Sequence, residues 1–205
     1  MKNLIKMKNT IFKTIILTTI FCMAMAYLES AIVVYLRALY YPEGFAFPLK
    51  LVEKNIVITE FFREIATVIM LACIGIVAGR KNNEKFAFFI YSFAVWDIFY
   101  YVFLKILLNW PGSFFTWDIL FLIPSPWVGP VIAPIINSLT MILLGGCIVY
   151  FTEKKGNARL GKIEWALLIA GAGVIIYAYT EEYLAFMLSR FSFSELLGKI
   201  GRAHV

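Results

Sequence analysis

Long apolar runs separated by short polar or charged segments dominate the pattern of the chain. A bilayer core about 30 Å thick requires roughly 20 apolar helical residues, and five runs reach that length. We therefore predict an all-α fold, a bundle of membrane-spanning helices that forms one transmembrane domain over residues 1–205. The predicted spans cover about residues 12–39, 56–78, 86–108, 128–151 and 163–188, and residues 191–205 are predicted to form an amphipathic tail at the interface.

The first apolar run follows a lysine-rich start and has the outline of a secretory signal peptide, with Ala24-Met25-Ala26 resembling a cleavage site. Beyond Ala26, however, the chain stays mostly apolar as far as Leu36. The run is therefore too long for the apolar core of a signal peptide and long enough to cross a bilayer. We interpret it as an uncleaved first span.

A shorter apolar run lies between the third and fourth predicted spans, at residues 114–123. Ten helical residues extend only about 15 Å, which is half of the hydrocarbon thickness. Pro124, Pro126 and Gly129 follow this run and disfavour a continuous helix. We therefore predict an interfacial or re-entrant hairpin around residues 111–127 that leads into the fourth span.

The distribution of basic residues predicts the orientation, because Lys and Arg concentrate in cytoplasmic loops. If the amino terminus is cytoplasmic, the cytoplasmic segments hold 11 of the 19 basic residues, and we expect the carboxyl terminus to be periplasmic or extracellular. These are Lys2, Lys6, Lys8, Lys13, Arg80, Lys81, Lys85, Lys154, Lys155, Arg159 and Lys162.

Composition supports a lipid environment, since 61% of residues are hydrophobic and only 16% are charged. The net charge of +6 does not indicate a nucleic-acid partner, because the bases lie in short clusters between apolar runs. Cys22, Cys73 and Cys147 are isolated in apolar segments, without the spacing of a redox pair or a metal site. The single histidine, His204, lies far from any predicted span, which argues against haem, His-ligated zinc or a histidine base.

Ionisable side chains within spans are costly unless they face a cavity or a partner, so each is a candidate functional group. Helical rise places seven acidic residues at a similar depth near the outer side, with only two or three bases. Some of these carboxylates are therefore expected to be protonated, solvated or bound to a cation. The acids are Glu29, Glu60, Glu64, Asp97, Asp118, Glu181 and Glu182, and the bases are Arg37, Arg63 and, at the end of its span, Lys105.

Helical spacing predicts two polar faces among these residues, at 100° per residue. One face carries Glu60, Arg63, Glu64 and Thr67, and the other carries Asp97, Tyr100, Tyr101 and Lys105. We take the candidate ligand-binding residues to be Glu29, Arg37, Glu60, Arg63, Glu64, Asp97, Tyr101, Asp118 and Glu181.

The nature of a ligand stays open at this point, and no cofactor is predicted. A metal ion here would be a hard one held by oxygens, but no carboxylate loop of the EF-hand type is present, so no metal site is predicted. A cation or a small polar solute is the alternative, with tryptophan and tyrosine rings as aromatic partners. The same rings also fit an interfacial aromatic belt.

Three functional hypotheses follow. The first is an outward-facing acidic and aromatic pocket that binds a cation or a small polar solute for transport. The second is an intramembrane hydrolase or transferase that acts on a lipid-type substrate, with Asp97 and Asp118 as acid and base. The third is an accessory subunit without its own site, in an oligomer or with a partner subunit. A purely structural alternative is that Arg63 neutralises Glu60 or Glu64 and fastens the bundle.

Two stretches of the sequence resemble bacterial integral membrane proteins of uncharacterised function. The first runs from Tyr35 to Phe45 and contains Tyr40-Tyr41-Pro42-Glu43-Gly44, and the second runs from Thr116 to Pro130 and contains Trp117-Asp118-Ile119-Leu120. The resemblance implies a bacterial inner membrane as the location. It implies no activity, ligand or catalytic residue.

Overall fold

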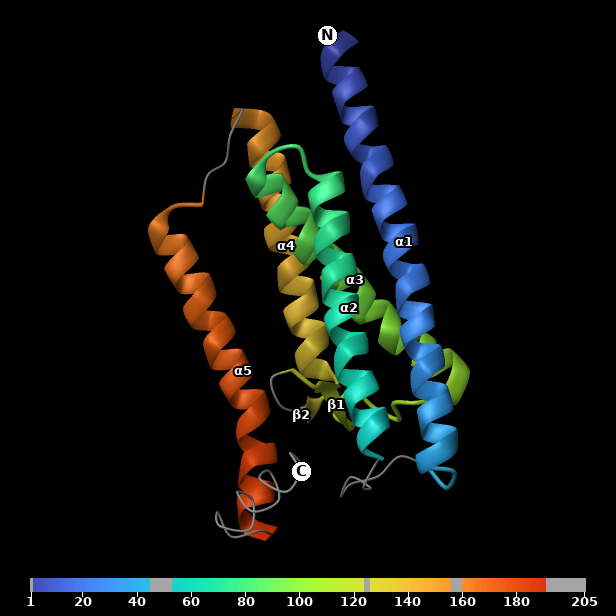
Figure 1. Cartoon of the computed structure of the whole chain (residues 1–205). Coiled ribbons are helices and arrows are strands. Elements are labelled where there is room, and N and C mark those ends of the chain that lie inside the picture. Colours follow the sequence, from blue (N-terminus) through green and yellow to red (C-terminus); the bar gives the residue numbers. More distant parts are fainter. Residues whose placement is uncertain (1, 45–52, 124–125, 156–159, 191–205) are drawn as a thin grey trace. The chain divides into compact units, whose positions relative to one another are not determined.

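The computed structural model describes residues 2–44, 53–123, 126–155 and 160–190, and within these ranges the side chains of residues 2–9, 155 and 182–190 are not described. The predicted interfacial tail at residues 191–205 lies outside the described residues. Within the described residues, five helices and two short strands follow one another (Figure 1). They are α1 (Lys2–Tyr40), α2 (Lys54–Ala78), α3 (Asn82–Leu108), β1 (Trp117–Phe121), β2 (Trp127–Pro130), α4 (Ile132–Lys155) and α5 (Lys162–Arg190).

All five helices are long and apolar enough to cross a membrane. Large apolar side chains are exposed along them, such as Leu17 at 68%, Val77 at 82% and Leu143 at 69%. So much exposed apolar surface is unfavourable in water and favourable in lipid. The predicted all-α transmembrane fold is confirmed, and the chain is a membrane protein.

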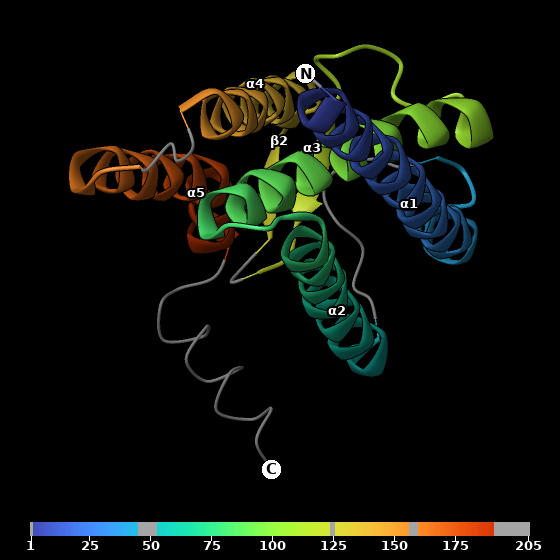
Figure 2. The same cartoon turned by 90° about the horizontal axis from the view of Figure 1, so that it is seen from above.

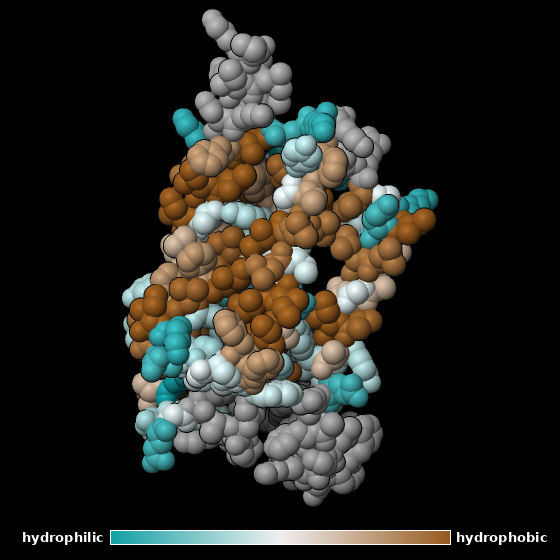
Figure 3. All heavy atoms as spheres, turned by 180° about the vertical axis from the view of Figure 1, so that it is seen from behind, coloured by the Kyte–Doolittle hydropathy of each residue, from teal (hydrophilic) through white to brown (hydrophobic). Residues whose placement is uncertain are grey.

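Backbone contacts divide the chain into two compact units. The first contains residues 1–116 and 130–160, and therefore α1 to α4. The second contains residues 117–129 and 161–205, and therefore α5, β1 and all of β2 except Pro130. Within the first unit the helices alternate in direction (Figure 1). In Figure 3, apolar atoms cover the middle of these helices on the face shown, and hydrophilic residues lie toward their ends.

Helix α3 is the centre of the first unit, because α1, α2 and α4 all pack against it (Figure 2). Just over half of its membrane-spanning window, 56%, is buried, against 22% in each of the other three. Helices α1 and α2, by contrast, contact each other little. Most of the packing between helices in this unit therefore involves α3.

Gly75 allows α2 to pack closely against α3. A Cβ atom added to Gly75 would lie 2.7 Å from the backbone nitrogen of Phe89, so only glycine fits at this crossing. Because lipid tails are as apolar as leucine, such close packing is a main source of helix association in membranes. Leu71 of α2 and Leu104 of α3 are fully buried in the same unit.

Helix α3 ends at Leu108 because Asn109 adopts the left-handed conformation, with φ of 51°. This residue type tolerates that conformation and is common at helix ends. The ammonium of Lys105 donates hydrogen bonds to the carbonyl oxygens of Asn109 and Pro111, at 3.4 and 3.1 Å. The basic group thus stabilises the carboxyl end of the helix, where carbonyls lack partners.

The segment between α3 and α4 is a two-stranded sheet, in which β1 pairs with β2. The predicted hairpin at residues 111–127 therefore contains strands, and whether it enters the membrane stays a prediction. The predicted start of the fourth span at residue 128 was wrong, since Trp127–Pro130 form β2 and α4 begins at Ile132. Backbone pairing with β1 satisfies the polar groups that a helical start would have used.

The second unit is held together by aromatic packing. The ring of Trp127 in β2 lies 5.5 Å from that of Phe121 in β1 and 5.8 Å from that of Tyr179 in α5, measured between centroids. A Cβ atom added to Gly129 would lie 3.3 Å from Leu120 and 3.4 Å from Tyr179, so the small residue suits this contact. These contacts join the hairpin to α5.

Candidate functional site

Arg63 of α2 lies among three carboxylates. Its Nη1 atom donates a hydrogen bond to Oε1 of Glu29 in α1, and its Nε atom donates to Oε2 of Glu60 at 2.8 Å. Its Nη2 atom lies 4.0 Å from Oε1 of Glu64. We call Glu29, Glu60, Arg63 and Glu64 the Arg63 cluster. It joins two helices that otherwise contact each other little.

The Arg63 cluster is largely shielded from solvent. The side chains of Arg63, Glu29, Glu60 and Glu64 are 18%, 10%, 13% and 8% exposed. Three carboxylates face one guanidinium, so the cluster is negative unless it holds additional positive charge. Excess charge within a membrane span is strongly unfavourable, which makes this cluster the leading candidate site.

Helical spacing explains why α2 contributes three of the four groups. Glu60 and Glu64 lie three residues before and one residue after Arg63, and Thr67 follows at the next turn. The hydroxyl of Thr67 donates to Glu29 Oε2 at 3.4 Å and to the Arg63 carbonyl oxygen at 3.1 Å. The predicted common face of these four residues is therefore seen in the structure.

Helix α3 contributes an aromatic side to this region. The hydroxyl of Ser30, one residue after Glu29, donates a hydrogen bond to the carbonyl oxygen of Tyr100 at 3.1 Å. The ring of Trp96 stacks on that of Tyr100, with centroids 6.4 Å apart. The buried Nε1 atom of Trp96 has no hydrogen-bond partner among the described residues, which leaves a free donor one turn from Tyr100.

Arg37 contacts an aromatic ring. Its guanidinium carbon lies 3.8 Å from the ring centroid of Trp110, a cation–π contact. The ring centroid of Trp110 in turn lies 6.5 Å from that of Tyr101, and the ring centroid of Tyr101 lies 4.9 Å from that of Tyr100. Aromatic rings thus connect Arg37 to the tyrosine beside the Arg63 cluster.

Asp97 does not join the Arg63 cluster through any described contact. Its Oδ2 atom accepts a hydrogen bond of 2.7 Å from the hydroxyl of Ser138 in α4. Lys105, which the spacing predicts on the same face of α3, donates to carbonyl oxygens at the end of that helix. Ser138 was missed by the sequence analysis, and its only signal was a hydroxyl group within an apolar helix.

The remaining candidates, Asp118 and Glu181, belong to the second unit. Asp118 lies in β1 and is 3% exposed, and Glu181 lies in α5 and is exposed. Asp97 belongs to the first unit, and the role of Asp97 and Asp118 as an acid–base pair stays a prediction. The ligand-binding role of all these residues stays a prediction.

Within the described part of the chain, no group of three or more His, Cys, Asp or Glu side chains is arranged to hold a metal ion. The carboxylates of the Arg63 cluster are instead arranged around a guanidinium that donates hydrogen bonds to Glu60 and Glu29 and lies 4.0 Å from Glu64. Comparison with known proteins adds nothing to this picture. No family model, curated protein or solved structure matches the chain.

Proposed function

We propose that the Arg63 cluster binds a small solute that carries an ammonium or guanidinium group, and that the protein transports it. The proposal rests on one observation, the excess of shielded carboxylates over cations within the membrane spans. A positively charged ligand would offset that excess. The cluster already holds a guanidinium, that of Arg63, which indicates the chemistry its carboxylates accept.

The neighbouring rings favour an organic cation over a metal ion. Ser30, next to Glu29, binds the backbone of Tyr100, whose ring stacks on that of Trp96, and aromatic rings attract alkylammonium and guanidinium groups. The free Nε1 donor of Trp96 suits a solute with an acceptor of its own, such as a zwitterion. We propose that this site faces outward.

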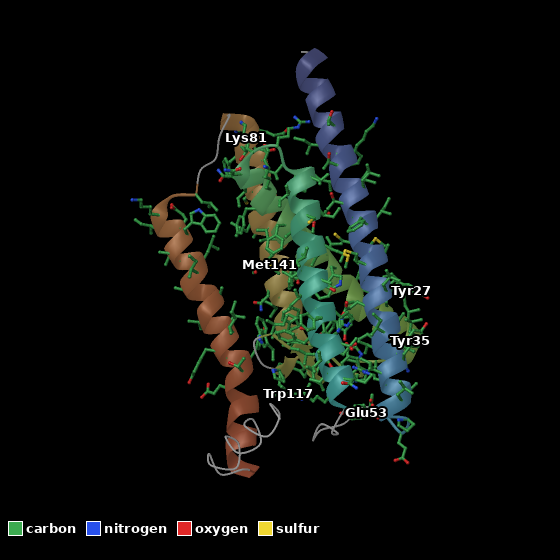
Figure 4. All side chains as sticks on the ribbon, viewed as in Figure 1. Tyr27, Tyr35, Glu53, Lys81, Trp117 and Met141 are labelled. Carbon is green, nitrogen blue, oxygen red and sulfur yellow. The ribbon has the colours of Figure 1, made fainter. Side chains whose placement is uncertain are left out.

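The proposed location is a bacterial inner membrane, with the amino terminus in the cytoplasm and the carboxyl terminus outside. The distribution of basic residues supports this orientation, because 11 of 19 lie in segments that it makes cytoplasmic. In that orientation Glu53, at the beginning of α2, is near the outer face and Lys81, beyond its end, is near the inner face (Figure 4).

Thermal unfolding of the purified full chain tests the binding site. The probes are methylammonium and methylguanidinium chloride, with sodium chloride at equal ionic strength as the reference. We expect either organic cation to raise the melting temperature of the wild type above the sodium chloride value. Glu60→Gln and Glu64→Gln are expected to lose this increase, since each removes one acid from the Arg63 cluster.

Glu53→Gln is the matched control. It removes one negative charge from the same end of α2. Glu53 is exposed, and although it occupies the N-cap position its side chain makes no capping hydrogen bond. This variant should respond to the probes as the wild type does. If Glu60→Gln and Glu53→Gln respond equally, or if neither cation stabilises the wild type more than sodium does, the proposed ligand class is wrong.

Uptake by vesicles distinguishes transport from the other two hypotheses. A transporter in sealed vesicles is expected to accumulate radiolabelled probe, and Glu60→Gln should abolish the accumulation. Binding without accumulation would instead favour a lipid-modifying enzyme or an accessory subunit, which stay predictions from the sequence.

A further inference from the structure

Asp97 occupies a position that calls for an explanation of its own. It lies roughly 22 Å from the beginning of α3 and roughly 16 Å from its end, at a rise of 1.5 Å per residue. This is well inside the hydrocarbon layer if α3 crosses it. Among the described residues its one polar contact is with the hydroxyl of Ser138, which is itself fully buried.

No charged group on the neighbouring helices neutralises Asp97. Between Thr14 and Tyr40, α1 carries only Glu29 and Arg37, and beyond its first residue α2 carries only the acids and the arginine of the Arg63 cluster. Arg63 interacts with those acids and Arg37 with Trp110, and neither contacts Asp97 among the described residues.

Helix α4 adds no charge from Ile132 to Thr152, so on that side Asp97 faces only the hydroxyl of Ser138. The titratable neighbours on α3 itself are Tyr100 and Tyr101, one turn away. A hydroxyl can donate to a carboxylate but cannot neutralise it, and an isolated carboxylate in a membrane is strongly unfavourable. The carboxyl group must therefore take up a positive charge from solution.

We propose that Asp97 and Ser138 form a proton-binding site within the membrane, separate from the Arg63 cluster. A proton from water binds one carboxylate oxygen of Asp97, and no other bond forms or breaks. The pair joins α3 to α4, so uptake and release of the proton change the contact between these two helices. This inference does not depend on the proposed solute.

A proton is the ligand that these contacts favour over a metal ion. Even Na⁺ requires several oxygen ligands, and the described contacts bring one carboxylate and one hydroxyl together. A proton needs only one carboxylate oxygen, with the Ser138 hydroxyl as its hydrogen-bond partner. The site can therefore be complete with the two residues that are seen.

Infrared difference spectroscopy on the full chain in lipid bilayers tests the proposal. As the pH is lowered, the wild type should gain the carbonyl band of a protonated carboxyl group in a low-dielectric environment. Asp97→Asn should lose that band. Ser138→Ala should keep the band but shift its frequency, because the carbonyl band responds to loss of a hydrogen bond.

Thr140→Ala is the control for Ser138→Ala, since it removes an exposed hydroxyl from the same helix; it should leave the band unchanged. Glu60→Gln should also keep the band, which separates this site from the Arg63 cluster. The Ser138→Ala shift is informative even if Asp97→Asn does not fold. The proposal is overturned if no such band forms, if it persists in Asp97→Asn, if Thr140→Ala shifts it equally, or if sodium chloride suppresses it at constant ionic strength.

Discussion

Arg63→Met tests how strongly the Arg63 cluster holds α1 and α2 together. Methionine keeps a long flexible apolar chain and removes the positive charge. At 4.0 Å, the distance from Arg63 Nη2 to Glu64 Oε1, two charges attract by about 4 kcal/mol at an effective dielectric constant of about 20. Removing one partner of a buried ion pair typically costs about 3–5 kcal/mol. Because Arg63 is 18% exposed, we expect a loss near the lower limit, about 3 kcal/mol.

The assay is reversible unfolding of the full chain in mixed micelles, followed by circular dichroism as the fraction of denaturing detergent rises. Glu29→Gln and the double variant complete a cycle. In the double variant the acid that faces Arg63 from α1 is also neutral, so the two losses should fall short of additivity by at least about 1 kcal/mol.

Arg80→Met provides the matched control, because it makes the same chemical change at an exposed position beyond the end of α2. Surface substitutions of this kind usually change stability by less than about 0.5 kcal/mol. The reasoning is refuted if Arg63→Met is no more destabilising than Arg80→Met, or if the Glu29 and Arg63 losses simply add.

Two further predictions concern helix packing, and the same unfolding assay measures both. Gly75→Ala should destabilise by about 1–3 kcal/mol, because its Cβ would overlap the Phe89 backbone; Gly146→Ala, with open space around it, should be neutral or stabilising by up to about 1 kcal/mol. Equal effects would show that the α2–α3 crossing is not tight. Tyr91→Phe should cost about 0.6 kcal/mol, since it removes the 2.7 Å hydrogen bond to Thr19 that joins α3 to α1, and an unchanged stability would contradict that role.

The five helices could be predicted from the sequence because each apolar run is long enough to cross a bilayer and is bounded by charged or turn-forming residues. The strands could not. Trp117–Phe121 and Trp127–Pro130 are short, and neither shows the regular alternation that marks a half-buried strand. Pairing between them determines their conformation, and that pairing is not visible in either segment alone.

The candidate site was predictable where the groups share one helix. The spacing of Glu60, Arg63 and Glu64 places them together whatever the neighbours do. The helical rise put Glu29 only at a similar depth, and its ion pair with Arg63 is a finding of the structure. The partner of Asp97 was not predictable, because the rotation of α4 about its axis decides which of its residues meets α3. The depth of each residue in the membrane can be counted from the sequence, but the rotation of the helix cannot.

The central position of α3 has a consequence for synthesis, since helices emerge from the ribosome in chain order. For a time α1 and α2 have both been synthesised, but α3, against which each of them packs, has not. The hydrogen bonds from Arg63 and Thr67 to Glu29 are then polar links available to this pair. Early pairing would shelter these side chains from lipid and give the arriving α3 an assembled partner rather than two separate ones.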